Sequence, residues 1–258
     1  MDFVEGFPAF ERACLLSSGG ADSTDSTTTE DQLAEQAASE FYKRVHTAYS
    51  AIFGADQSTE LMKVAAKLEV DGRESAMPPT TSLTYGEIDF WSFADILERI
   101  EMSRGDTFVD LGSGTGRALV TAGLLFGPLL ARVHGVEILQ TLHERCEKNL
   151  HRLSAMLRED DAFAEHACCK LSSELGDATN NSTAALDWTV ADVVFMNSTL
   201  FDDRLMLALS ALAGAKMRKG TRVITLTRPL SSSAFSVIDT RNYRMSWGLA
   251  MAFFHVKM

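Results

Sequence analysis

The sequence has few of the features that mark secreted, disulfide-bonded or membrane-spanning proteins. Four cysteines occur in 258 residues, without a CxxC spacing or a recognisable disulfide framework: Cys14, Cys146, Cys168 and Cys169. Such sparse cysteine usage favours a reducing, intracellular compartment. The chain does not open on a cationic segment followed by an apolar run, so no secretory signal is expected. The apolar stretch 118–131 has 14 residues and contains Gly127-Pro128, a length that suits a buried helix rather than a membrane span.

Positive charge is also scarce. The chain has 24 lysines and arginines against 35 aspartates and glutamates, a net charge of −11, which argues against nucleic acid as a direct partner. The charges are unevenly spread, because residues 1–31 carry a net −6 while residues 216–258 carry eight bases and one acid. Two interpretations of this basic C-terminal region remain. Its bases are scattered and solvated, or they form a cationic face capable of weak contact with DNA.

The N-terminal part predicts a tail followed by helices. Residues 17–31 are rich in Ser, Thr, Gly and Asp without apolar periodicity, so we expect a flexible acidic tail over residues 1–31. Apolar residues then recur every three or four positions over residues 32–53, which predicts an amphipathic helix, and a second helix is expected over residues 58–68. Because Pro78-Pro79 forbids continued helix, we predict a helical N-terminal subdomain that ends at residue 77.

The remainder of the chain alternates between short apolar strands and amphipathic helices, which is typical of a parallel α/β sheet. The expected strands cover residues 107–111, 132–137, 167–175, 191–197 and 221–227. The expected helices cover residues 88–100, 116–126, 139–157 and 202–217. The end of the chain differs, since residues 243–247 and 249–257 predict a terminal antiparallel hairpin.

The strongest local signal is a glycine-rich turn in the segment TFVDLGSGTGRALV, residues 107–120. A strand ends in Asp110, and Gly112, Gly114 and Gly116 follow before a helix starts. Glycine is needed where the backbone turns sharply and approaches a ligand closely. The next acidic strand end is Glu137, 21 residues after Gly116, where a carboxylate can accept hydrogen bonds from both ribose hydroxyls.

Spacing distinguishes the kinds of nucleotide that such a turn binds. A dinucleotide fingerprint is GxGxxG and places a pyrophosphate on the helix N-terminus, whereas here Arg117 stands where the third glycine would fall. An acid before the loop, Asp110, would repel a pyrophosphate but suits the α-ammonium of a methionine moiety. DLGSGTG resembles the first motif of class I S-adenosylmethionine-dependent methyltransferases. A dinucleotide enzyme and a non-catalytic glycine turn remain the alternatives, and Asp177 at the third strand end either contacts an adenine amino group or caps a turn.

Three further segments narrow the resemblance. TYGE, residues 84–87, lies about 25 residues before the glycine loop; FMNSTLFDD, residues 195–203, ends the fourth strand; and MSWG, residues 245–248, precedes the last strand. Together with the glycine loop and GVE, these segments resemble the disruptor-of-telomeric-silencing family over about residues 78–258. Members of that family are non-SET histone lysine methyltransferases that modify a lysine on the folded core of histone H3.

The resemblance implies a Rossmann-like class I fold, with a mainly parallel seven-stranded sheet, in a catalytic domain over residues 78–258. It implies S-adenosylmethionine as cofactor and no metal. The residues implied in cofactor binding are Tyr85, Gly86 and Glu87 over the methionine end, Asp110, Gly112, Ser113, Gly114 and Gly116 around that end, Glu137 on the ribose, Asp177 on the adenine, and Asn197. The residues implied in catalysis are Asn197 beside the transferring methyl group, Tyr85 in the loop that closes over the methionine end, and Phe195, Trp247 and Phe253 as walls of a lysine channel.

An aromatic channel makes chemical sense for lysine methylation. A lysine with its reference pKa of about 10.4 is protonated at neutral pH, and reaching the nucleophilic neutral form costs roughly 4–5 kcal/mol. Apolar walls and a neighbouring sulfonium both disfavour the ammonium. Simple packing remains the alternative for Trp247, and one of Phe253 and Phe254 is expected to face the core. Where the family usually has a second asparagine and an aromatic, this chain has Ser198-Thr199.

The sequence therefore predicts a protein-lysine methyltransferase that acts on histone H3 in a nucleosome, in the nucleus and without a membrane. Two alternatives remain. The first is a lysine methyltransferase for a non-histone protein, which would allow a cytoplasmic location. The second is a catalytically silent chromatin-binding module of the same fold.

Overall fold

A computed structural model of the chain describes residues 29–54, 59–73, 88–180, 186–245 and 247–258. The chain divides into two compact units, residues 1–51 and residues 52–258. The domain limits expected from the sequence, at residues 31 and 77, remain predictions. No helix in the described ranges is long and apolar enough to cross a membrane.

The described part of the first unit is helical. Helix α2, Thr29–Phe53, begins three residues before the expected start and ends where the apolar periodicity ends. The hydroxyls of Thr47 and Ser50 donate to carbonyl oxygens one turn earlier, each at 2.8 Å, which keeps these polar side chains compatible with a helix.

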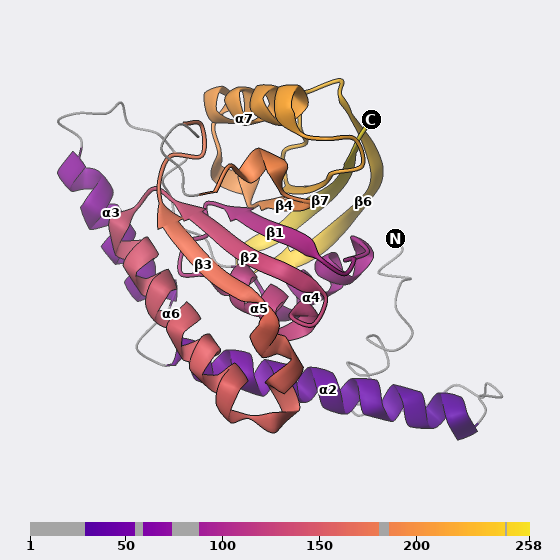
Figure 1. Ribbon diagram of the computed structural model, residues 1–258. Coiled ribbons are helices and arrows are strands. Elements are labelled where there is room, and N and C mark those ends of the chain that lie inside the picture. The colour runs from indigo at the N-terminus through magenta and orange to yellow at the C-terminus, as the bar shows by residue number, and fades with distance from the viewer. Residues whose placement is uncertain (1–28, 55–58, 74–87, 181–185, 246) are drawn as a thin grey trace. The chain divides into compact units, whose positions relative to one another are not determined.

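The second unit is built on one seven-stranded sheet (Figure 1). The strands follow the order β3-β2-β1-β4-β5-β7-β6. The first five are parallel to one another, and β7 is antiparallel to both β5 and β6. This arrangement confirms the expected parallel sheet with a terminal antiparallel hairpin. The strands are β1 Asp106–Leu111, β2 Leu130–Glu137, β3 Lys170–Leu175, β4 Val193–Met196, β5 Arg222–Leu226, β6 Phe235–Met245 and β7 Gly248–Lys257.

Two strand expectations differ from the structure. The segment 161–168 is a 3-10 helix, capped by the Asp160 carboxylate, which accepts from the Ala162 amide at 2.9 Å, so β3 begins only at Lys170. At the other end, β6 begins at Phe235 rather than Tyr243. Because β6 is the edge strand, most of its residues are exposed or half-buried, and it lacks the apolar alternation by which sequence patterns reveal a strand.

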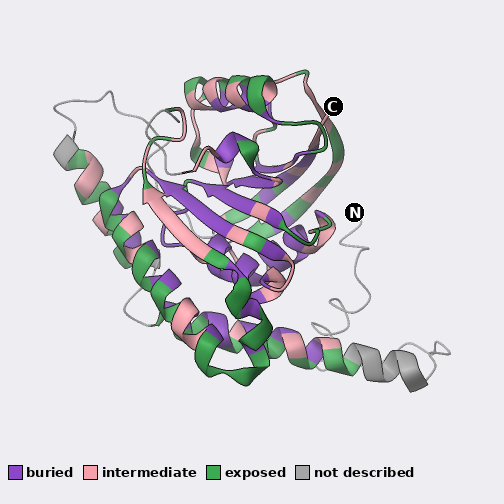
Figure 2. Cartoon of the chain, in the orientation of Figure 1, coloured by how far each residue is buried: buried purple, intermediate pink, exposed green. Residues whose placement is uncertain are grey.

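Helices cover both faces of the sheet (Figure 1). Helix α7 lies on one face, where Leu209, Ala213 and Met217 pack with residues of β1, β4 and β5. Helices α4, α5 and α6 lie on the opposite face. Figure 2 shows that the central strands between these layers are almost wholly buried. The helices are α4 Phe90–Arg99, α5 Arg117–Phe126, α6 Gln140–Glu159 and α7 Asp203–Lys216, with short 3-10 helices Trp188–Val190 and Ser198–Leu200.

Helix α3, Thr59–Arg73, lies along α6. Met62 and Ala66 of α3 form a small buried apolar cluster with Leu139 and Leu142. The Glu69 carboxylate accepts from the amides of Gln140 and Thr141, each at 2.8 Å. Glu69 therefore caps the first turn of α6 from outside that helix, where the N-cap residue itself makes no side-chain bond.

Candidate functional site

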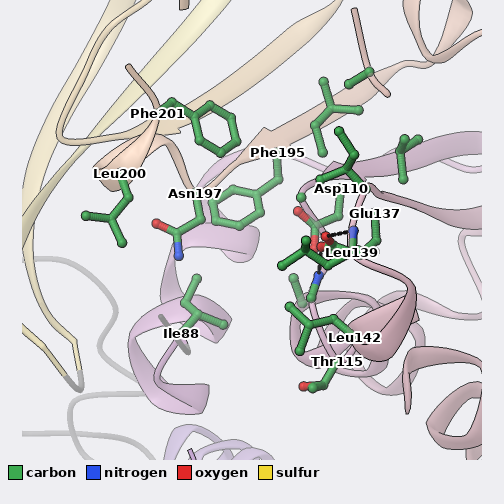
Figure 3. A pocket seen from close by; sticks show the side chains of 18 of the residues that line it. Ile88, Asp110, Thr115, Glu137, Leu139, Leu142, Phe195, Asn197, Leu200 and Phe201 are labelled. Atoms are coloured by element: carbon green, nitrogen blue, oxygen red, sulfur yellow. Dashed lines mark hydrogen bonds between the residues drawn. The ribbon is translucent and has the colours of Figure 1, made fainter. Parts of the chain in front are cut away.

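A pocket of about 390 Å³ lies along the carboxyl edge of the parallel strands (Figure 3). It is lined by residues that follow β3, β2, β1 and β4, which are neighbours in the sheet. Polar strand ends therefore gather at one edge, the place where open α/β sheets bind ligands. The volume is in the range of small-molecule sites. Among the described residues, no group of histidine, cysteine, aspartate or glutamate side chains could hold a metal ion.

The glycine turn after β1 lines this pocket. Gly112, Gly114 and Gly116 have φ of 80°, 54° and 86°, in the left-handed region that glycine adopts without steric cost. Gly112 and Gly114 line the pocket, but Gly116 does not. A Cβ on Gly116 would lie 2.7 Å from the sulfur of Cys146, so this glycine permits close packing of the turn on α6.

Asp110 places a buried carboxylate at the start of the turn. The side chain lines the pocket, the residue is 3% exposed, and its Oδ1 has no hydrogen-bond partner in the described part of the chain. Burial, and then the nearby Glu137, raises the pKa of Asp110 well above its usual range. Leaving a buried carboxylate without a partner is costly. An ammonium group in the pocket would remove that cost, so the residues present fit the α-amino group of S-adenosylmethionine.

Glu137, at the end of β2, is buried but hydrogen-bonded. Its carboxylate accepts from the amide of Gly114 at 2.7 Å and from the amide of Leu139 at 2.8 Å. Burial raises the pKa of Glu137, and these backbone bonds oppose that shift. Because each carboxylate oxygen has two lone pairs, the group keeps acceptor capacity for the hydroxyls of a ribose.

Asp177 follows β3 and also lines the pocket. Its Oδ1 accepts from the amide and from the hydroxyl of Thr179, each at 2.8 Å. The side chain therefore caps a turn, as one of the two sequence interpretations expected. Its place in the pocket wall is compatible with the other interpretation, a contact with adenine.

The part of the pocket beside β4 is aromatic. Phe195 lies directly across from Asp110 in the sheet register, is 1% exposed, and packs with its ring centre 4.7 Å from that of Phe93. Asn197 follows β4 and lines the same end. Trp247 lies in the turn between β6 and β7, and within the described residues its buried indole N–H has no acceptor. Since β7 runs antiparallel to β5, this turn projects at the carboxyl edge and reaches the pocket.

Some expected site residues lie elsewhere. Tyr85, Gly86 and Glu87 fall outside the described residues. Phe253 does not line the pocket. It lies within β7, opposite Thr225 of β5, so the whole of β5 separates it from β4 and the pocket. Its neighbour Phe254 is the more buried of the two, at 1% exposure.

The structure also brings residues to the pocket that sequence reasoning did not select. The Phe201 ring lies against the glycine turn, since a Cβ on Gly112 would be 3.4 Å from its Cζ. Ile88 precedes α4, and Lys63 reaches the pocket from α3. The proximity of Phe201 to Asn197 in the sequence was an available signal. No sequence pattern indicated that α3 would lie over this edge of the sheet.

The fold and the site together define the class. A seven-stranded sheet of this order, with an acid-led glycine turn at its carboxyl edge, is the class I methyltransferase fold. The rRNA methyltransferase aviRa from Streptomyces viridochromogenes shares the fold, with a TM-score of 0.51 and 14% identity over 71% of this chain and 92% of that one.

The family follows from the sequence match. A family model described as "Histone methylation protein DOT1" matches residues 75–249, and the chain belongs to that family. Two similar proteins, both named "Histone-lysine N-methyltransferase, H3 lysine-79 specific", come from Caenorhabditis elegans and Candida glabrata. The first is 28% identical over 56% of this chain and 15% of its own length. The second is 26% identical over 63% of this chain and 24% of its own length. The match therefore spans less than a quarter of these relatives.

Proposed function

We propose that the chain is an S-adenosylmethionine-dependent protein-lysine N-methyltransferase whose substrate is a core lysine of histone H3. The observation that carries the proposal is the buried Asp110 carboxylate. It faces a pocket that is also lined by Phe195, Asn197 and Trp247. The pocket therefore combines an acid that needs a cation with a neighbouring aromatic wall. Membership of the DOT1 family and the names of its relatives support the histone substrate.

Each residue of the pocket would have its own role in binding or catalysis. Asp110 would hold the α-ammonium, Glu137 the ribose and Asp177 the adenine end, with Gly112, Ser113 and Gly114 close against the methionine part. When bound, S-adenosylmethionine supplies an electrophilic methyl group. Phe195 and Trp247 would exclude water from the incoming lysine, which lowers the pKa of its ammonium by desolvation. Asn197 would orient the reacting groups through its amide, so that catalysis depends mainly on positioning.

The location and partners belong to the same proposal. A histone substrate implies the nucleus and a nucleosome. Five of the eight C-terminal bases face acidic partners, Arg222 with Asp106 at 2.7 Å among them. These ion pairs offset much of the cationic charge. A weak contact with DNA would then depend on Lys219, Arg244 and Lys257.

A labelling experiment tests the proposal. The purified chain would be incubated with S-adenosylmethionine carrying a radioactive methyl group and with nucleosomes, free histone H3 or a histone-free cell extract. We expect label in histone H3, and none when Asn197→Ala replaces the wild type. Label only in the extract would contradict the histone assignment. Calorimetry that detects no binding of S-adenosylmethionine would contradict an enzyme altogether.

A further inference from the structure

Strand β5 ends in a strained turn. Thr227, which follows Leu226, has φ of 66°, in the left-handed region that β-branched residues avoid. The amide of Arg228 donates to the carbonyl oxygen of Leu226 at 2.7 Å. Thr227 is therefore the central residue of a γ-turn of the rare, strained hand.

Two neighbouring elements hold this turn in place. The Thr227 amide donates to the carbonyl oxygen of Met251 on β7 at 2.6 Å. From the other side, the Ser198 hydroxyl donates to the carbonyl oxygen of Leu226 at 2.6 Å, and Ser198 is fully buried. Strained backbone persists only where its surroundings impose it, and such positions cluster at functional sites. The strain at Thr227 therefore indicates that the contacts of its side chain are functional.

The side chain of Thr227 is connected to Asn197 through the hydroxyl of Thr199. Its Oγ1 lies 3.1 Å from the Oγ1 of Thr199. The Thr199 hydroxyl in turn donates to the Oδ1 of Asn197, also at 3.1 Å. A threonine hydroxyl has one proton. Because Thr199 gives its proton to Asn197, Thr227 must be the donor between the two hydroxyls. With the Asn197 Oδ1 accepting from Thr199, the chain of donors runs from Thr227 to Thr199 to Asn197.

We propose that Thr199 and Thr227 are positioning residues for Asn197, forming a two-hydroxyl relay that fixes which way the Asn197 amide faces at the pocket. The inference rests on the proposed function, in which Asn197 lies beside the reacting groups. The torsion that rotates a side-chain amide is soft, and half a turn exchanges its carbonyl and amino ends. The relay assigns the carbonyl end to Thr199, so the same amide edge meets the pocket in every turnover.

The strained turn explains why the relay can act. Thr227 is exposed, and an exposed hydroxyl would otherwise sample several rotamers in water. Anchoring its backbone on β7 and on Ser198 limits where its Oγ1 can lie. The two hydroxyls, anchored on the sheet, therefore restrict the side-chain amide of Asn197, which follows β4. Supporting residues preorganise functional groups in the same way.

Five variants test the relay. Thr199→Val and Thr227→Val remove each hydroxyl while keeping the branched shape, and Thr199→Ser and Thr227→Ser retain it. Thr240→Val, on the exposed edge strand β6, is the matched control. For each variant we would measure kcat and KM for methyl transfer to nucleosomes, the Kd for S-adenosylmethionine, and the nuclear magnetic resonance signals of the Asn197 side-chain amide. Thermal melting would verify that each variant is folded.

We expect Thr199→Val to lower kcat about tenfold, the equivalent of one lost hydrogen bond, with the cofactor Kd unchanged. Thr227→Val should lower it by a smaller factor, because Thr199 can still donate. The two Ser variants and Thr240→Val should behave as wild type. In the resonance experiment, Thr199→Val should shift or broaden the Asn197 amide signals and Thr199→Ser should not.

A folded Thr199→Val variant with wild-type kcat, or unchanged Asn197 amide signals, would overturn the relay. Loss of activity that Thr199→Ser does not restore would also overturn it. These results differ from failure of the proposed function, in which the wild type itself would transfer no methyl group to histone H3. In that case the Asn197 amide signals still decide whether the relay exists.

Discussion

Asp110 combines two properties that a purely structural residue would not need together. It is 3% exposed and carries a carboxylate oxygen without a partner among the described residues. Glu137 beside it is equally buried, yet both of its oxygens accept backbone hydrogen bonds. The carboxylate of Glu137 is thus hydrogen-bonded within the fold, whereas the carboxylate of Asp110 keeps an oxygen for a ligand.

The first prediction concerns Asp110→Asn, which keeps the shape and removes the charge. We expect S-adenosylmethionine to bind about tenfold to a hundredfold more weakly, because a charge-assisted hydrogen bond contributes about 1.5–3 kcal/mol. The ligand-free variant should melt no lower than the wild type, since it no longer buries an unpaired charge. Calorimetry and thermal melting give the two values. Undiminished affinity would remove Asp110 from the cofactor site.

The second prediction concerns the pH dependence of stability. Burial raises the pKa of Glu98 on α4 to about 7, against a smaller opposite effect of Arg99. A carboxyl with a raised folded-state pKa binds more protons folded than unfolded above its ordinary pKa, so its contribution to stability falls as pH rises from about 4.5 to 7. Glu98→Gln should therefore melt higher than wild type at pH 8 and equally at pH 4. A constant difference between the variants across this range would assign the effect to packing instead.

At the scale of elements, the strand pattern of the sequence was sufficient for most of the sheet. Strand β4 is a continuous apolar run that ends just before Asn197, and β1 ends in Asp110-Leu111, so these strand ends locate the pocket. Edge strand β6 could not be delimited, because a strand with exposed faces needs no apolar alternation.

Of the site residues, too, only some could be selected from the sequence. Asp110, Glu137, Phe195 and Asn197 could be selected because they terminate or lie within central strands, and all four line the pocket. Trp247 also lines it, but only the antiparallel register of β7 explains why. Phe253 lies on the same strand but opposite Thr225, with β5 between it and β4, and does not line the pocket. Such positions depend on which strands pair and in which register, and a single sequence pattern does not show this pairing.

The third prediction concerns the attachment of α3 to α6. Glu69→Ala removes the carboxylate that caps Gln140 and Thr141, which should cost about 1 kcal/mol of unfolding free energy, as for other helix caps. Because Lys63 of the same helix lines the pocket, the affinity for S-adenosylmethionine should fall as well. Denaturant titration and calorimetry give the two values. Asp71→Ala, at an exposed acid of the same helix, is the control.

A wild-type result for Glu69→Ala in both measurements would mean that the cap contributes nothing to the position of α3. A loss of stability with unchanged affinity would restrict its role to folding. An equal effect in Asp71→Ala would assign the change to the loss of charge on the helix.

At the scale of the whole molecule, the second unit places one pocket across four neighbouring strand ends. Binding there should couple to global stability, because a ligand that binds only the folded chain stabilises it by mass action. We expect S-adenosylhomocysteine at a hundred times its Kd to raise the unfolding free energy by about 2.7 kcal/mol, and by less in Asp110→Asn at the same concentration. Thermal melting with and without ligand measures this effect. A nicotinamide dinucleotide should give no stabilisation, and stabilisation by it would reverse the assignment of the glycine turn.

The most direct test of the account is a crystal structure of the chain with S-adenosylhomocysteine. We expect its α-amino group within hydrogen-bond distance of the Asp110 carboxylate, its ribose hydroxyls on Glu137, and its sulfur directed toward Asn197 and Phe195. A ligand bound away from the glycine turn, or with its sulfur directed toward Asp177, would contradict the account.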